Sequence, residues 1–149
     1  GLKEITVPGS VTALGSDVFN GCSGLTSATL EEGVSAVTTN MFMGCSALRY
    51  VYLPDSLRTI DSQAFRDCVS LQRITLPQGL TSVGSHGFYN CTALQRVTIP
   101  ASVTTIDSHA FDGCPLTDVY YGGTQAQWDA MAIDPSNTTL ANATIHFAG

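Results

Sequence analysis

Apolar residues recur along this chain of 149 residues at a constant spacing of 23 residues. Aligned on that spacing, the chain divides into five units, and the same seven positions stay apolar in each unit. The units begin at Leu2, Leu25, Leu48, Leu71 and Leu94. In the third unit the seven positions are Leu48, Val51, Leu53, Leu57, Ile60, Phe65 and Cys68. Because each unit could bury such an edge only against its neighbours, the pattern predicts a solenoid of stacked coils.

Alternation of apolar and polar residues predicts a short β-strand early in each unit. The runs Ile5 to Val7, Ile74 to Leu76 and Val97 to Ile99 all alternate in this way. In four units a proline comes next and ends the strand, because proline has no N–H to donate. These prolines are Pro8, Pro54, Pro77 and Pro100. A second apolar pair, such as Leu57 with Ile60, predicts another short extended segment in each coil.

Each unit closes with the motif Phe-x-x-Cys, and the residue before the cysteine is always glycine, aspartate or asparagine. These three residue types best tolerate a positive φ. The residues concerned are Gly21, Gly44, Asp67, Asn90 and Gly113. The motif therefore predicts a compact turn or 3₁₀ corner, with one left-handed residue in every coil.

All five cysteines occupy the same position of the repeat, which favours a structural role. Stacked coils would bring equivalent Cα atoms to about 4.8 Å, within disulfide range, but equivalent side chains point the same way and five cannot all pair. Metal binding would need converging ligands at CxxC-like spacing, and a catalytic thiol would need one exposed thiolate beside a base. We therefore predict five reduced, buried and inert thiols. They are Cys22, Cys45, Cys68, Cys91 and Cys114.

Composition narrows the possible partners. The net charge is −6 and only 12% of the residues are charged. An acidic surface repels phosphate backbones and anionic lipids, so we expect neither nucleic acid nor a membrane surface as a partner. No apolar run approaches the roughly 18 residues of a transmembrane helix, so we expect no membrane insertion of this segment. Leu2 lies inside a pattern that is already running, which leads us to expect further repeats before it and a longer, multidomain protein.

The third unit, LRYVYLPDSLRTIDSQAFRDCVS from Leu48 to Ser70, resembles the BspA-like leucine-rich repeat. The resemblance runs from Leu2 to Pro115, and it is specific because proline, phenylalanine and cysteine recur together. Its departures are Glu31 in place of the proline and Ala28 in place of a larger aliphatic residue. The resemblance implies a right-handed solenoid with short parallel strands on its concave face and turns or 3₁₀ segments elsewhere. It also implies an extracellular or cell-surface bacterial protein whose repeats serve adhesion or partner binding, with no shared catalytic residues.

The last part of the chain departs from the 23-residue period. Residues 1–115 form the five repeats, and residues 116–149 are expected to form a sixth, partial repeat and a C-terminal cap of a helix and a strand. Thr124 with Gln127 has the pattern of a capping box for a helix that runs through Trp128 and Met131 and ends before Asp134-Pro135. The alternating run Ala143 to Phe147 predicts a final strand. We interpret Trp128 as packing in this cap, with ligand stacking as the alternative.

Histidine is the only residue type that offers candidates for metal binding or catalysis. His86 and His109 occupy the same repeat position, so they are expected about one strand spacing apart. Such a pair could bind a divalent metal ion weakly, with Asp61 or Asp107 nearby, but the position precedes a buried phenylalanine, where a solvated turn accepts any polar residue. The chain has no G-x-S-x-G, P-loop or H-E-x-x-H motif. We therefore predict no enzymatic activity and no cofactor, and the histidine pair remains a weak metal candidate.

A binding surface is predicted from the residues that point outward from the strands. The central rows carry two tyrosines beside two arginines, and these residue types are enriched at the energetic centres of protein interfaces. The candidate ligand-binding residues are Tyr50, Tyr52, Arg73, Arg96 and Tyr120. Parallel coils are expected to place the first four in one continuous patch. Three functions remain open: recognition of a host or bacterial surface protein, which we favour; binding of a carbohydrate; and a passive spacer between domains.

Overall fold

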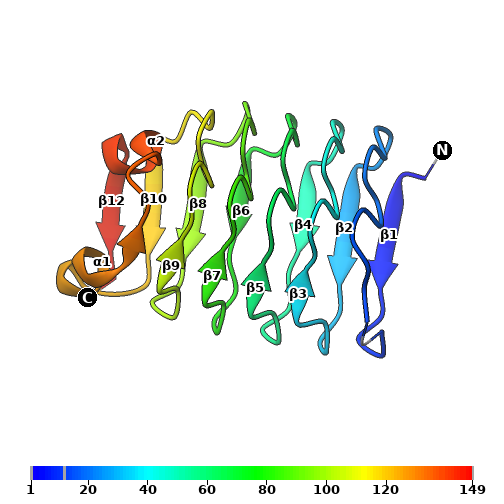
Figure 1. Cartoon of the computed structure of the whole chain (residues 1–149), viewed down its shortest axis with the longest axis horizontal. Helices are drawn as coiled ribbons and strands as arrows, with labels where there is room; N and C mark the ends of the chain where they lie inside the picture. Colours follow the sequence, from blue (N-terminus) through cyan, green and yellow to red (C-terminus); the bar gives the residue numbers. More distant parts are fainter. Residues whose placement is uncertain (1, 12, 149) are drawn as a thin grey trace.

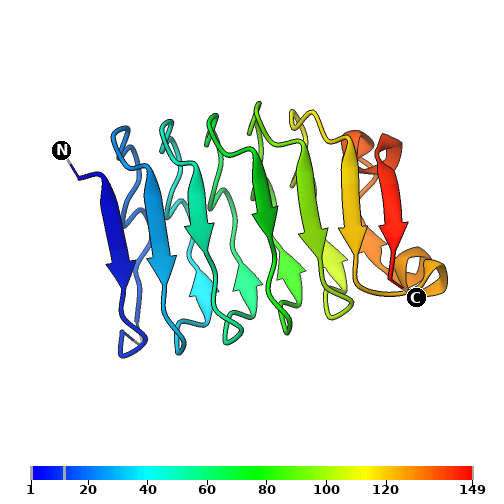
Figure 2. The same cartoon turned by 180° about the vertical axis from the view of Figure 1, so that it is seen from behind.

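The computed structural model describes residues 2–11 and 13–148. The chain forms a parallel β-solenoid whose coils stack along one axis, with a row of front strands and a row of shorter back strands (Figures 1 and 2). The front strands are β1 (Glu4–Val7), β2 (Ser27–Leu30), β4 (Tyr50–Tyr52), β6 (Arg73–Thr75), β8 (Arg96–Ile99), β10 (Asp118–Tyr121) and β12 (Thr144–Phe147). The back strands are β3 (Ala36–Val37), β5 (Thr59–Ile60), β7 (Ser82–Val83), β9 (Thr105–Ile106) and β11 (Ala132–Ile133).

Strand register follows the 23-residue period. Val97 of β8 pairs with Ile74 of β6, and Ile60 of β5 pairs with Val83 of β7. The back strands form one continuous five-stranded sheet, whereas the front strands form a three-stranded sheet (β1, β2, β4) and a separate four-stranded sheet (β6, β8, β10, β12). Below, coils 2, 3, 4 and 5 denote residues 25–47, 48–70, 71–93 and 94–115.

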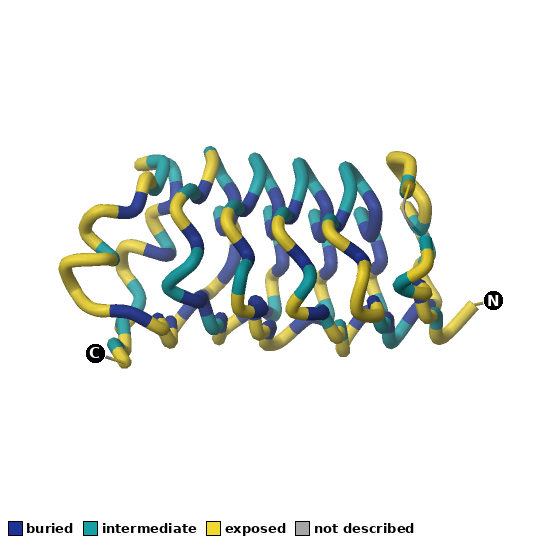
Figure 3. The backbone as a smooth tube through the Cα atoms, turned by 90° about the horizontal axis from the view of Figure 1, so that it is seen from below, coloured by how far each residue is buried: buried dark blue, intermediate teal, exposed yellow. Residues whose placement is uncertain are grey.

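The core is a set of ladders built from equivalent residues of successive coils, visible as repeated buried positions along the tube in Figure 3. The phenylalanine ladder is the clearest. Its rings are stacked nearly parallel at centroid distances of 5.6 Å (Phe19 and Phe42), 5.4 Å (Phe42 and Phe65), 5.1 Å (Phe65 and Phe88) and 5.2 Å (Phe88 and Phe111). Burial of large aromatic rings contributes strongly to stability, so this ladder holds the coils together.

The corner before each cysteine has the predicted left-handed residue. The φ angles are 62° at Asp67, 60° at Asn90 and 74° to 83° at the three glycines of this position. Successive corners are also joined by backbone hydrogen bonds, for example from the Phe65 N–H to the Gly87 carbonyl (2.7 Å). The corner of every described coil is therefore built in the same way.

Cysteine has a hydrogen-bonding role in this corner. The Cys68 thiol donates to the Phe42 carbonyl (3.2 Å) and the Cys91 thiol donates to the Phe65 carbonyl (3.1 Å), in each case the phenylalanine of the preceding coil. Four cysteines are buried and all five are free thiols. The prediction of five buried thiols is wrong for Cys22, which is only partly buried because it lies in the first coil, where no coil of this chain covers its outer side.

The C-terminal segment continues the solenoid with modified turns. Helix α1 (Gln125–Ala130) has the predicted capping box between Thr124 and Gln127, but it ends at Ala130, earlier than predicted. The chain then enters β11, which extends the back sheet, passes through helix α2 (Thr138–Asn142), and ends in the predicted strand as β12. The edge of the Trp128 ring packs on Tyr121 at 5.1 Å, consistent with its interpretation as a packing residue.

Side chains of the C-terminal segment form hydrogen bonds to the last regular coil that another repeat would otherwise form. The Thr139 hydroxyl donates to the Phe111 carbonyl (2.9 Å), the same bond that a cysteine thiol makes in the repeats. Asn137 is 2% exposed; its side-chain oxygen accepts from the Phe111 N–H (2.9 Å), and its amide donates to the Asp107 carbonyl (2.9 Å). These contacts satisfy backbone groups that a sixth Phe-x-x-Cys corner would otherwise pair.

The described residues include no helix with the length and apolar character that a membrane crossing requires.

Candidate functional site

The front face is interrupted between coil 3 and coil 4. Strands β4 and β6 are consecutive front strands, yet they belong to different sheets. Figures 1 and 2 both show wider spacing between β4 and β6 than between other neighbouring front strands. The two coils stay joined at the back, where β5 pairs with β7, and at the corner, where Phe65 stacks on Phe88. The gap is therefore a wedge that opens only on the front.

Missing backbone hydrogen bonds define the two edges of this wedge. Between coils 4 and 5, the Gln95 N–H donates to the Gln72 carbonyl (3.0 Å) and the Leu76 N–H donates to the Thr98 carbonyl (2.9 Å). Between coils 3 and 4, the equivalent bonds would join Gln72 to Arg49 and Leu53 to Thr75. Across residues 2–11 and 13–148, neither of these two backbone bonds is formed.

A cleft of about 550 Å³ occupies the wedge, within the roughly 300–1,000 Å³ range of ligand pockets. Its floor is apolar, because Val51 and Leu53 are partly exposed there, whereas their counterparts in coil 4, Ile74 and Leu76, are buried. Its remaining lining residues are Arg49, Tyr50, Tyr52, Asp55, Ser70, Gln72, Arg73, Ile74, Thr75 and Pro77. Three of the five predicted site residues, Tyr50, Tyr52 and Arg73, thus line one cleft.

Aromatic and cationic side chains dominate the accessible part of the cleft. Tyr50 and Tyr52 are each 59% exposed, the highest values among the exposed large apolar side chains of the described residues. Arg49 and Arg73 are exposed, and in the part of the chain that the structure describes neither is ion-paired. Asp55 is the one acidic residue of the lining. The cleft is therefore locally positive on a chain with a net charge of −6.

Tyr50, Tyr52 and Arg73 lie together, but across a cleft and not on a continuous sheet. Arg73 does lie beside Arg96, its direct partner in the β6–β8 pairing, but the cleft separates β4 from both. Tyr120 lies further along the front face in β10, where it is 41% exposed and its ring stacks on His146 at 4.6 Å. The 23-residue period predicts equal stacking for every pair of coils, so the cleft could not be predicted from it.

Arg58 lies at one end of the cleft, between the turns that follow β4 and β6. Its guanidinium donates to the carbonyls of Asp55 (2.8 Å) and Leu57 (3.2 Å) in the first turn. On its other side it packs against Gly79 of the second turn, so closely that a side chain at Gly79 would collide with it. The equivalent positions hold Ser35, Thr81 and Thr104, so only coil 3 has a long cation there.

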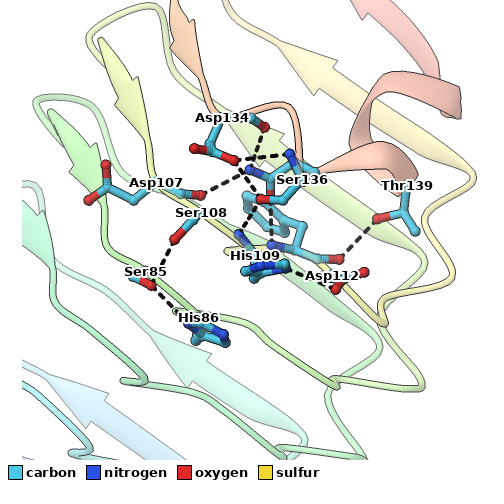
Figure 4. Close-up of polar contacts among 11 residues, drawn as sticks. Ser85, His86, Asp107, Ser108, His109, Asp112, Asp134, Ser136 and Thr139 are labelled. Carbon is cyan, nitrogen blue, oxygen red and sulfur yellow. Dashed lines mark hydrogen bonds and ion pairs between the residues drawn. The ribbon is translucent and has the colours of Figure 1, made fainter.

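The histidine pair is located away from this cleft, on the corner ridge (Figure 4). The rings of His86 and His109 lie 5.0 Å apart, as predicted, but their Nδ1 atoms are engaged with the Ser85 hydroxyl (2.8 Å) and the Asp112 carboxylate (3.1 Å). Partial burial, and then the neighbouring His109, lower the pKa of His86. Within the described ranges, no three His, Cys, Asp or Glu side chains converge as a metal site would require.

The repeat position of these histidines has a conformational requirement that the sequence analysis missed. The φ angle is 58° at His86 and 56° at His109, and the same position has positive φ at Asp17, Asn40 and Gln63. It therefore does not accept any polar residue; it favours side chains such as asparagine, aspartate and histidine that tolerate the left-handed region. Their recurrence at 23-residue spacing was a signal that could have identified a second left-handed turn.

Comparison with known proteins agrees with this architecture. A family model described as the BspA type leucine rich repeat region matches residues 1–120 in six copies. The chain belongs to this family. A comparison with curated proteins gave no match.

Solved structures of bacterial leucine-rich repeat proteins have the same fold. A leucine rich repeat protein of T. pallidum is 34% identical, with a TM-score of 0.74 over 80% of this chain and 58% of its own. A leucine rich cell surface protein of Faecalibacterium prausnitzii is 29% identical, with a TM-score of 0.79 over 88% of this chain and 35% of its own. A leucine-rich repeat protein of Bacteroides ovatus is 29% identical, with a TM-score of 0.75 over 100% of this chain and 43% of its own. This chain therefore spans between about a third and three fifths of those proteins.

Proposed function

We propose that the chain is a non-catalytic binding module of a bacterial cell-surface protein, and that it recognises a protein partner through its front face. The observation that carries this proposal is the cleft between β4 and β6, with its exposed tyrosines and unpaired arginines. Tyrosine offers a large contact area at low conformational cost, and arginine can bind a carboxylate with two hydrogen bonds. A locally positive cleft on an acidic protein favours a partner that presents an anionic group.

The surface location is supported by the relatives. One similar structure is that of a protein described as a cell surface protein, and the similar solved structures come from bacteria. The absence of catalysis is proposed for two reasons. His86 is engaged with the Ser85 hydroxyl and His109 with the Asp112 carboxylate, and the lining of the cleft contains no histidine or cysteine.

The proposal is tested by comparing two double variants of the chain. Tyr50→Ala with Tyr52→Ala removes the aromatic lining, and Gln63→Ala with Arg66→Ala makes an equal number of changes on the corner ridge. Both are assayed against an array of bacterial and host surface proteins and against a glycan array. We expect the first variant to bind a protein found by the parent chain at least about tenfold more weakly, and the second to bind it unchanged.

The alternative functions give different results in the same assay. Tyrosine platforms also suit sugars, so binding confined to the glycan array would replace the protein partner by a carbohydrate. No detectable binding on either array would favour the function of a passive spacer between domains. Equal binding by the two double variants would place recognition away from the front face.

A further inference from the structure

The two walls of the cleft are unpaired edges of β-sheets, and they face each other. Strand β4 presents the Arg49 carbonyl and the Leu53 N–H toward coil 4, and coil 4 presents the Gln72 N–H and the Thr75 carbonyl in return. In the described part of the chain no backbone bond joins these groups across the cleft, although the equivalent bonds between coils 4 and 5 are formed. An open sheet edge is a template for another strand, and natural proteins usually cover or blunt it. Here, two such edges border one cleft.

We infer that the cleft binds an extended peptide segment of a partner protein, inserted as a strand between β4 and β6. This inference rests on the proposed function and specifies its ligand class. Backbone hydrogen bonds to both edges would supply affinity, as in other cases of β-strand addition, and side-chain contacts would supply selectivity. A small sugar or a rigid globular surface would leave most of these edge groups unpaired.

The lining specifies the side chains of that segment. Alternate residues of an inserted strand point to opposite faces. On the inner side they would meet the partly exposed Val51 and Leu53, so small apolar or β-branched residues fit there. On the outer side they would pass between Tyr52 and Arg73, so an acidic residue fits there. Arg49, Arg58 and Arg73 bring three of the six basic residues of the chain to this region.

In this inference the Arg58 side chain keeps the cleft open by holding the turns after β4 and β6 apart. Between coils 4 and 5, which are fully paired, the Gly79 N–H donates directly to the Ser102 hydroxyl (3.1 Å), and between coils 2 and 3 the Gly33 N–H donates to the Ser56 hydroxyl (2.9 Å). Between coils 3 and 4 the equivalent acceptor position is Gly79, which has no hydroxyl, and the Arg58 guanidinium lies where a side chain of residue 79 would begin. Thr81 and Thr104 at the equivalent position instead donate to the carbonyl of the preceding coil (2.9 and 3.3 Å). The Thr81 bond goes to the Arg58 carbonyl itself, so coils 3 and 4 are joined by the backbone at this position and only the Arg58 side chain differs. Arg58→Thr removes the guanidinium from between the two turns, and we expect β4 and β6 then to pair.

The role of Arg58 is tested first without any ligand, by measuring amide hydrogen exchange at single residues. In the parent chain, Gln72 and Leu53 should exchange rapidly while Gln95 and Leu76 are protected. Arg58→Thr should protect Gln72 and Leu53, and the matched control Arg66→Thr, on the corner ridge, should not. Protection of Gln72 and Leu53 in the parent chain would mean that the front sheet is continuous in solution, and the inference would be wrong.

Peptide binding is then measured with a phage-displayed library of random heptapeptides selected on the immobilised chain. We expect enriched peptides that combine β-branched residues with an acidic residue. As synthetic peptides, they should bind Arg58→Thr at least about tenfold more weakly than the parent, because several backbone bonds are lost at once, and bind Arg66→Thr unchanged. N-methylation of alternate peptide amides should weaken binding similarly. Failure to enrich any peptide, or equal binding by both variants, would overturn strand insertion.

The same variants separate this inference from the proposed function. If a protein partner is lost with Tyr50→Ala and Tyr52→Ala but still binds Arg58→Thr, the front face is the recognition surface and strand insertion is wrong. If selected peptides lose affinity for Arg58→Thr while no surface protein binds the parent chain, the cleft accepts strands and the proposed cell-surface partner is wrong.

Discussion

Coils 3 and 4 contact each other at the corner and at the back, where β5 pairs with β7, but they differ from the other coils at the front. At the corner, Phe65 stacks on Phe88 and the Phe65 N–H bonds to Gly87, as in every neighbouring pair. At the front, β4 and β6 do not pair. The corner buries large aromatic rings, whereas the front strands are only three or four residues long, so we expect the corner to stabilise the contact between coils more than the front does. One junction can therefore open on the front without loss of the fold, and the front is where function can vary.

The largest expected effect comes from breaking the corner. Phe65→Ala removes a fully buried ring that contacts both Phe42 and Phe88, and truncation of a core aromatic costs about 3–5 kcal/mol. Tyr52→Ala, on the front and 59% exposed, should change the free energy of unfolding by only about 0.5 kcal/mol. Urea denaturation followed by circular dichroism measures both. Similar losses in the two variants would show that the corner is no more important than the front.

A second large effect is expected where the C-terminal segment substitutes for a corner. Asn137→Ala leaves the Phe111 N–H and the Asp107 carbonyl without their partner, and each unsatisfied buried group costs about 1–3 kcal/mol. We expect a loss of about 2–4 kcal/mol, concentrated in the last coils. Hydrogen exchange should show faster exchange at Phe111 while Phe42 stays protected. As a control, Asn142→Ala changes an exposed asparagine of the same segment and should have little effect.

A smaller effect tests the second left-handed turn of the corner. His86→Ala places a residue without a polar side chain at φ 58°, which should cost about 1 kcal/mol. His86→Asn restores the residue type found at position 40 and should leave the melting temperature unchanged. If alanine and asparagine are equally tolerated, conformation does not select the residue here. A rise in melting temperature with zinc, lost in His86→Asn, would instead support the metal interpretation of the pair.

A further effect concerns the thiols of the corner and depends on pH. Burial, followed by the charge of Cys22, raises the pKa of Cys45 from 9.0 to about 11, and burial also raises the pKa values of Cys68 and Cys91. The folded state then holds protons that the unfolded state releases, so this stabilisation is complete below pH 9 and is lost as the pH rises toward 11. We expect the free energy of unfolding to fall over that interval, and to fall less in Cys45→Ser.

Thiol labelling sharpens the same point. An alkylating reagent at pH 8 should modify Cys22 first in the native protein, because Cys22 is the one partly buried cysteine. The other four cysteines should react only after unfolding. Mass spectrometry of the labelled peptides gives the order. Rapid modification of Cys68 in the native protein would contradict the buried corner.

The sequence by itself determined the features that repeat. The 23-residue period, the inward phenylalanine and cysteine, and the glycine, aspartate or asparagine before the cysteine predicted the coils, the core ladders and the left-handed corner, because each depends on contacts that every coil makes in the same way. The sequence also identified Tyr50, Tyr52 and Arg73 as neighbours on one face. It indicated the capping box of α1 but neither its end at Ala130 nor the addition of β11 to the back sheet.

Only the tertiary structure decided where the repeat is broken. Arg58 and Gly79 are 21 positions apart and meet only when the coils stack, and our inference assigns the separation of β4 from β6 to that contact. The 23-residue period describes only the features that all coils share, so it cannot predict a single junction that differs from the others. The cleft, its unpaired edges and the partial exposure of Val51 and Leu53 all lie at that one junction, which no contact shared by the other coils could reveal.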